Sequence, residues 1–115
     1  MAATDWKSFT DQTNKRMAEM RKAYPAVAKG FAELATAAIA PGALDSKTKE
    51  LIALAIGVAV RCDGCLAFHT KAAAKFGATR EEVADALGVA VYMGGGPSAI
   101  YAAEAMSAWD ELTAR

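Results

Sequence analysis

The sequence predicts an all-α fold: a single-domain bundle of about six helices that takes in residues 1–115. Alanine, the best helix former, is the commonest residue. The β-branched residues are scattered and do not alternate with polar ones, as they would in a half-buried strand. A chain of 115 residues with 54% hydrophobic content has the length of one domain and is too apolar for a disordered chain.

A helix cap and a proline predict the first two helices. Thr4 or Asp5 can cap a helix over residues 5–23. Pro25 suits the first turn of a second helix, which should run to about Ala40 before a Pro-Gly pair breaks the pattern. The apolar side of the first helix carries Trp6, Phe9, Met17 and Met20.

An uninterrupted apolar run identifies the third helix, which Asp45 or Ser46 can cap. The run, Leu51 to Val60, has ten residues, about half of the ~20 needed to span a bilayer. We therefore expect a core helix whose second half is covered on all sides.

Glycines and capping residues delimit the last three helices. The fourth should begin near Cys62 or Cys65 and end at Phe76, with a glycine in the C-cap position. A capping box over residues 79–82 should open the fifth helix. The glycines at 94–96 end that helix, and a proline in the next position suits the start of the sixth.

The charge balance and the N-terminal composition argue against two classes of partner. Thirteen Lys plus Arg against 13 Asp plus Glu leave no basic surplus for binding a phosphate backbone. The N-terminal residues include an acid, Asp5, and no apolar stretch of signal-peptide length. We expect no nucleic-acid partner, no membrane partner and a cytoplasmic location.

The two cysteines and the single histidine lie close together in the sequence. In a helix with 100° per residue, Cys62, Cys65 and His69 would share one face. A thiol reacts as its thiolate, which a helix N-terminus and a nearby imidazole both favour. Cys65 could have both, because Asp63 and Gly64 favour a helix start there and the histidine follows one turn later.

Glu50 lies where the polar start of the third helix gives way to the apolar run. A carboxylate is costly to bury without a partner, and a buried one can donate or accept a proton near neutral pH. A lone glutamate in a first helical turn is more often solvated. Both interpretations stay open at this point.

The Cys-x-x-Cys pair with a histidine has three interpretations: redox chemistry, a zinc or other metal site, and buried unreactive thiols. Zinc would need an unusual set of ligands, without a second Cys or His pair: Cys62, Cys65, His69 and Glu50. The segment from Gly94 to Ser98 could hold an anion at a helix N-terminus. It is more simply a tight turn, since no strand precedes it.

These residues resemble the alkylhydroperoxidase D-like, carboxymuconolactone decarboxylase superfamily. The matching pattern is Glu50, eleven residues, Cys62-x-x-Cys65, three residues and His69, within a similarity that covers about residues 44–105. The resemblance implies an all-α bundle that assembles into trimers or hexamers and reduces peroxides through a cysteine pair. The decarboxylating branch of the family lacks this pair.

The resemblance also implies a role for each residue of the pattern. Cys65 would be the thiol that attacks peroxide and Cys62 the resolving thiol, while Glu50 and His69 would form a proton relay. Peroxidases of the family often carry a second histidine just before the second cysteine, where this chain has Gly64. One member of the relay would therefore be missing.

The implied partners are a small peroxide substrate and a dithiol reductant protein, either lipoyl-bearing or thioredoxin-like, with no cofactor. The alternatives are a zinc-binding or structural helical oligomer and a non-redox family member such as a lactone decarboxylase. Further copies of the chain would complete a homotrimer or homohexamer, because the Ala-rich helices offer flat apolar faces for packing between subunits. The candidate interface residues are Trp6, Met17, Met106 and Trp109.

Overall fold

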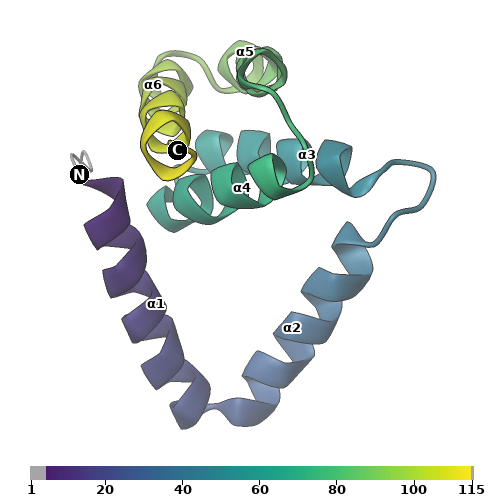
Figure 1. The fold of residues 1–115 in the computed structure, drawn as a ribbon, viewed down its shortest axis with the longest axis vertical. Coiled ribbons are helices and arrows are strands. Elements are labelled where there is room, and N and C mark those ends of the chain that lie inside the picture. The colour runs from purple at the N-terminus through teal and green to yellow at the C-terminus, as the bar shows by residue number, and fades with distance from the viewer. Residues whose placement is uncertain (1–4, 115) are drawn as a thin grey trace.

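The structure, a computed structural model, describes residues 5–114 and holds six α-helices in that range (Figure 1). They are α1 (Trp6–Ala23), α2 (Pro25–Ile39), α3 (Ser46–Ala59), α4 (Asp63–Lys75), α5 (Arg80–Gly94) and α6 (Gly96–Leu112). No strand occurs among the described residues. The predicted all-α fold is confirmed, with helix bounds close to those expected. Between residues 5 and 114, no helix combines the length and hydropathy needed to cross a membrane.

The N-terminus of α1 is anchored to the end of α6. Asp5 caps the helix by accepting a hydrogen bond from the backbone N–H three residues later at 3.0 Å, whereas Thr4 lies outside the described residues. The Glu111 carboxylate accepts hydrogen bonds from the backbone N–H groups of Trp6 and Lys7 at 2.9 and 2.8 Å. These N–H groups have no partner within their own helix, and the negative charge suits the helix dipole.

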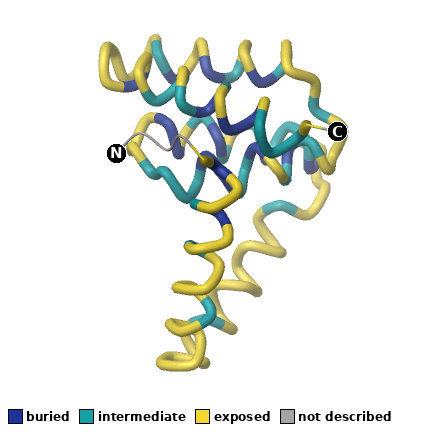
Figure 2. Tube along the Cα trace, turned by 60° about the vertical axis from the view of Figure 1, so that its left-hand side comes forward, coloured by how far each residue is buried: buried dark blue, intermediate teal, exposed yellow. Residues whose placement is uncertain are grey.

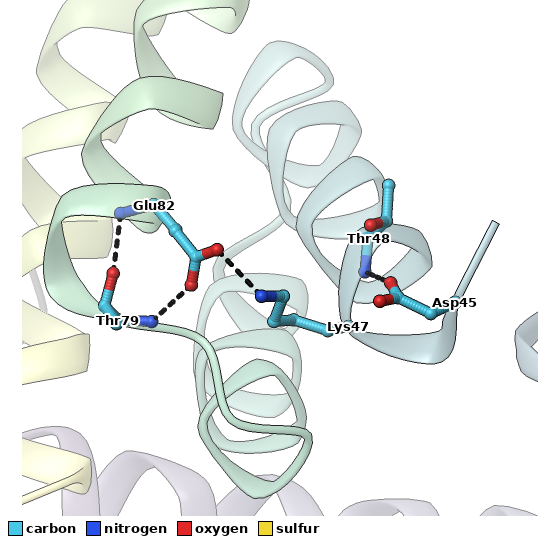
Figure 3. A network of polar contacts seen from close by, with 5 residues as sticks. All are labelled: Asp45, Lys47, Thr48, Thr79 and Glu82. Atoms are coloured by element: carbon cyan, nitrogen blue, oxygen red, sulfur yellow. Dashed lines mark hydrogen bonds and ion pairs between the residues drawn. The ribbon is translucent and has the colours of Figure 1, made fainter.

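A polar network joins the N-termini of α3 and α5 (Figure 3). Asp45 caps α3 by accepting a hydrogen bond from the Thr48 N–H at 2.8 Å. Thr79 and Glu82 form the predicted capping box, with N–H to side-chain oxygen distances of 2.9 and 3.1 Å. Lys47 donates to the other oxygen of the Glu82 carboxylate at 2.8 Å. This hydrogen bond, followed by that from the Thr79 backbone, lowers the pKa of Glu82.

The core lies between α3, α4, α5 and α6 and is closed by Trp6 from α1. Its buried apolar residues are Trp6, Leu54, Val58, Leu66, Ala67, Ala73, Val83, Leu87, Ala90, Ala105, Ala108 and Trp109. Many of these residues are alanines, so the helices approach closely and the large side chains fill the remaining space.

The expected interface role of both tryptophans is wrong. Trp6 is 1% exposed and Trp109 is 8% exposed, so both belong to the core of their own chain. Met106 is partly buried against the same core, and Met17 is exposed. The indole rings carry the largest apolar area in the sequence, and burying them within the domain removes that area from water without a second subunit.

The second half of α3 is not covered on all sides, contrary to the sequence-based expectation. Ile52, Ile56 and Val60 are exposed. Helices α4, α5 and α6 pack against α3, and these three side chains lie on the side that they leave open. The uninterrupted apolar run therefore marks a helix with a core face and a second apolar face.

Helices α1 and α2 form a V-shaped arm that projects from the four-helix core (Figures 1 and 2). In α1 the buried residues are Trp6 and Thr10, both at the end next to α6. In α2 no residue is buried. We refer to residues 6–39 as the arm and to helices α3–α6 as the body.

The Lys47–Glu82 pair should make folding stability depend on pH. Because its folded pKa lies below the ordinary value of 4.5, Glu82 stabilises the fold above that pH, and the contribution is lost as pH falls through the folded pKa. Glu82→Gln keeps the cap but removes the charge. Its thermal midpoint should lie a few degrees below that of the parent at pH 7, and the difference should vanish near pH 3.

The control is Glu81→Gln, whose exposed side chain has no ion pair or hydrogen bond within residues 5–114. An equal midpoint difference at both pH values would contradict the assignment.

Candidate functional site

A tight turn between α3 and α4 places the two cysteines. The Cys62 N–H donates to the Gly57 carbonyl at 2.9 Å and the Arg61 N–H to the Val58 carbonyl at 3.2 Å. This is the hydrogen-bond pattern of a Schellman motif, which needs a left-handed residue just after the helix. Arg61 takes that conformation with φ of 60°, although glycine is the usual occupant. The turn reverses the chain, so α4 packs back along α3.

A disulfide joins Cys62 and Cys65, whose Cα atoms are 5.2 Å apart. Cys62 is the N-cap residue of α4, and its Sγ accepts a hydrogen bond from the Cys65 N–H at 3.2 Å. Helix α4 starts at Asp63, as the Asp-Gly pair predicted. Both cysteines are half-buried. After reduction of the disulfide, the free N–H groups and dipole of this helix start favour a thiolate in its first turn.

Glu50 and His69 meet across the α3–α4 pair, although they are 19 residues apart in the sequence. The distance from His69 Nδ1 to Glu50 Oε1 is 2.6 Å. Glu50 is 5% exposed, so its interpretation as a solvated first-turn residue is wrong. The imidazole is the partner that the buried carboxylate needs. With Nδ1 bound to Glu50, Nε2 is the ring nitrogen left to exchange a proton elsewhere.

Gly57 brings α3 into close contact with the candidate site. A Cβ atom at this position would lie 2.8 Å from the Cβ of Cys65, closer than two carbon atoms can pack. In the sequence, an isolated glycine inside an apolar helical run indicates such a close helix contact. The sequence does not show that Cys65 is the residue it contacts.

Tyr101 of α6 is a further residue of the site that the motif did not reveal. Its phenol lies beside Asp63, between the two cysteines in the sequence. The pKa of Tyr101 is raised, first by a hydrogen bond to the Asp63 carboxylate, and then by burial and by the negative charge of Asp63. The phenol therefore stays protonated at neutral pH.

Two alternative sites suggested by the sequence are not supported by the geometry. The glycine-rich segment before α6 is a tight turn, in which Gly95 has φ of 75° and Gly94 is in close contact with the buried Ser98. In the described part of the chain, no three His, Cys, Asp or Glu residues are grouped so that they could hold a metal ion. The ligand set considered for zinc is therefore not assembled.

Three features together indicate the class of this protein. They are the all-α body, the Cys-x-x-Cys disulfide at the start of α4 and the buried Glu50–His69 pair. The model of the carboxymuconolactone decarboxylase family matches residues 25–108. The chain belongs to this family. Its relatives include an uncharacterized protein of Cupriavidus necator, 40% identical over 111 residues, which are 96% of this chain and 98% of the relative.

Solved structures of the same family share the fold. The apo structure of a family protein from Legionella pneumophila is 49% identical, with a TM-score of 0.92, and the match covers 96% of this chain and 99% of that one. A family protein from Thermotoga maritima, with a suggested role in the antioxidative response, is 31% identical. Its TM-score is 0.79, and the match covers 90% of this chain and 88% of the other.

The contact between Gly57 and Cys65 should make position 57 intolerant of a methyl group. Gly57→Ala must push α3 and α4 apart, which we expect to lower the free energy of unfolding by about 1–3 kcal/mol. Gly88→Ala is the matched control, because a Cβ at this helical position of α5 meets no atom within 4 Å. It should stabilise the protein by about 0.5–1 kcal/mol. Urea unfolding measures both, and a stabilised Gly57→Ala protein would refute the close contact.

Proposed function

We propose that this protein is a thiol-dependent peroxidase or disulfide oxidoreductase that uses Cys62 and Cys65 with a Glu50–His69 proton relay. One observation carries the proposal: a disulfide-forming pair at a helix start lies on the same helix, one turn before a histidine bound to a buried carboxylate. The suggested antioxidative role of the Thermotoga maritima relative supports the same chemistry.

The first step is attack of the Cys65 thiolate on one oxygen of a peroxide. A sulfur–oxygen bond forms, the O–O bond breaks, and Cys65 becomes a sulfenic acid while the other oxygen leaves as an alkoxide. The His69 imidazolium, which took the thiol proton, returns it to the alkoxide and gives an alcohol. Cys62 then displaces hydroxide from the sulfenic acid, which yields water and the Cys62–Cys65 disulfide.

Glu50 has two roles in this scheme. Its hydrogen bond to Nδ1 orients the imidazole, so that Nε2 is available for the reacting proton. Its negative charge, buried at 5% exposure, stabilises the imidazolium that forms when His69 takes the thiol proton. The absence of a second histidine at Gly64 leaves His69 as the proton carrier between thiol and leaving group.

A dithiol protein must return the electrons for a second turnover. In this proposal a lipoyl-bearing or thioredoxin-like protein attacks the half-buried disulfide, becomes oxidised itself and leaves both cysteines as thiols. The active form is a homotrimer or homohexamer.

A peroxide-consumption assay with a panel of dithiol donors tests this function. We expect consumption of one peroxide for each donor dithiol oxidised, and loss of turnover after both cysteines are alkylated. No consumption with any donor, together with conversion of a lactone substrate, would instead favour the decarboxylase activity that gives the family its name.

The relay predicts a large kinetic effect of a small change at position 50. Glu50→Gln keeps the shape and can still accept the hydrogen bond from Nδ1, but it cannot stabilise the imidazolium. Turnover should fall by roughly 10²-fold or more, with little loss of stability. Glu81→Gln on α5 is the control and should keep full turnover. Full activity of Glu50→Gln, or a loss explained by unfolding alone, would exclude the relay.

The two cysteines should give opposite products with peroxide. In Cys62→Ser, Cys65 should react once and then accumulate sulfenic or sulfinic acid, because no second thiol can trap it. In Cys65→Ser, the remaining thiol should stay unoxidised, since Cys62 precedes α4 and is about two helical turns from His69. Intact-mass measurement after a few equivalents of peroxide distinguishes the two. Equal rates of oxygen addition in both variants would overturn the assignment of Cys65 as the attacking thiol.

A further inference from the structure

Asp63 and Cys65 project from nearly opposite sides of the first turn of α4. At 100° per residue, two positions of the helix separate their side chains by about 160° around its axis. Cys65 lies on the side of α3, where it contacts Gly57. Asp63 lies on the side of α6, where it is hydrogen-bonded to Tyr101. The acidic residue between the two cysteines is therefore held on a different face of α4 from Cys65.

Tyr101 restrains the Asp63 carboxylate from the neighbouring helix. The tyrosine is half-buried and packs against the core, and its helix α6 packs against α4. Its hydroxyl donates a hydrogen bond to the carboxylate of Asp63, which is also half-buried. Because packing fixes the ring, this bond keeps the carboxylate on the α6 side of the helix start.

Three charged residues act on the Tyr101 phenol. The hydrogen bond to the Asp63 carboxylate has the largest effect on the pKa of Tyr101. The positive charge of Arg61 lowers this pKa, and the negative charge of Glu104 raises it. These two residues act through space and with opposite signs. The hydrogen bond is therefore the directed contact of this cluster.

The first turn of α4 can stabilise either a thiolate or a carboxylate. The first N–H groups of a helix have no partner within it, and the positive end of the helix dipole favours any negative group. The Cys65 N–H already donates to the Sγ of Cys62 at 3.2 Å. Asp63 is the acidic residue of this turn. Its carboxylate would compete with a thiolate for the same N–H groups if it turned toward them.

The other elements around this helix start bring different groups. On α4 itself, His69 is bound to Glu50 of α3 at 2.6 Å. On the side of α1, a Cβ atom at Gly64 would meet the methyl group of Thr13 at 3.9 Å. Apart from the cysteines, Asp63 is thus the ionisable group that the first turn of α4 carries.

We propose that Tyr101 is a positioning residue of the redox site, which holds the Asp63 carboxylate on the α6 side of α4 and so leaves the helix start to the thiolates. This inference rests on the proposed function, because the thiolate in question is the one that attacks peroxide. Without the phenol, the carboxylate can turn toward the N–H groups of the first turn. A second negative charge there disfavours a thiolate at Cys65.

The pH dependence of Cys65 alkylation tests this role. Iodoacetamide reacts with the thiolate, and Cys62→Ser leaves Cys65 as the single thiol while serine keeps a capping oxygen. In this background, Tyr101→Phe keeps the packed ring and should raise the midpoint of the pH profile by about 0.5–1 pH unit. Below the midpoint, alkylation should be roughly 3- to 10-fold slower, and the rates should converge above it, where both proteins are fully ionised.

Asp63→Asn separates the effect of the carboxylate from that of the ring. Removing the negative charge should lower the midpoint of the Cys65 profile. Once the carboxylate is gone, adding Tyr101→Phe should have no further effect on the midpoint. The matched control is Tyr92→Phe on α5, because this tyrosine is 84% exposed and should leave the profile unchanged.

Two results would overturn the proposal. One is an unchanged midpoint in Tyr101→Phe. The other is an equal effect of Tyr101→Phe with and without the Asp63 carboxylate, which a purely structural role of the ring would give. Urea unfolding checks that each variant is folded. If Tyr101→Phe does not fold, Asp63→Asn decides alone, and a midpoint that it does not lower contradicts the proposal.

Alkylation needs neither peroxide nor a dithiol donor, so its outcome is independent of the peroxidase assay. Peroxide turnover together with an unchanged Cys65 profile in Tyr101→Phe would overturn the role of Tyr101 and leave the proposed function intact. A raised midpoint in a protein that consumes no peroxide would support the role of Tyr101 in thiolate formation and refute the peroxidase activity.

Discussion

The close packing of α3 against α4 is the constraint on which the rest of the structure depends. It is possible because position 57 has no side chain, so the backbone of α3 can approach Cys65. The turn at Arg61 then returns the chain directly along α3. Leu54 and Val58 of α3 and Leu66 of α4 are fully buried in the resulting core. A larger residue at 57 would separate the two helices at the position of the redox pair.

The same packing explains how a carboxylate can be buried in an apolar core. Glu50 would carry a large desolvation penalty alone, and the alignment of α3 with α4 brings the His69 imidazole within 2.6 Å of it. The pair therefore depends on the helix contact and at the same time restricts its register, since sliding α4 along α3 would leave the carboxylate without its partner. The helix contact and the proposed chemistry rest on one interaction, because the imidazole that is hydrogen-bonded to Glu50 also lies one turn beyond Cys65.

The arm is anchored to the body near its first residues. Its root is fixed by Trp6 in the core and by the Glu111 carboxylate at the start of α1. Beyond this root, the arm carries apolar residues that the body does not bury. The exposed face of α3 likewise carries apolar residues that the body does not bury, namely Ile52, Ile56 and Val60. The apolar residues that fold the domain and those that remain exposed therefore lie on different parts of the same chain.

The sequence alone determined the local features of this protein. Caps such as Asp5, Asp45 and Thr79, and the breaks at proline and glycine, set the helix bounds, because capping and backbone conformation depend on neighbouring residues only. The spacing of Cys65 and His69 put them one turn apart on α4 for the same reason. Only the tertiary structure decided what depends on distant segments. It placed Glu50 against His69, set Gly57 against Cys65, buried both tryptophans and left one face of α3 exposed. A hydrophobic pattern shows which residues avoid water, but whether their own domain covers them depends on how the helices pack.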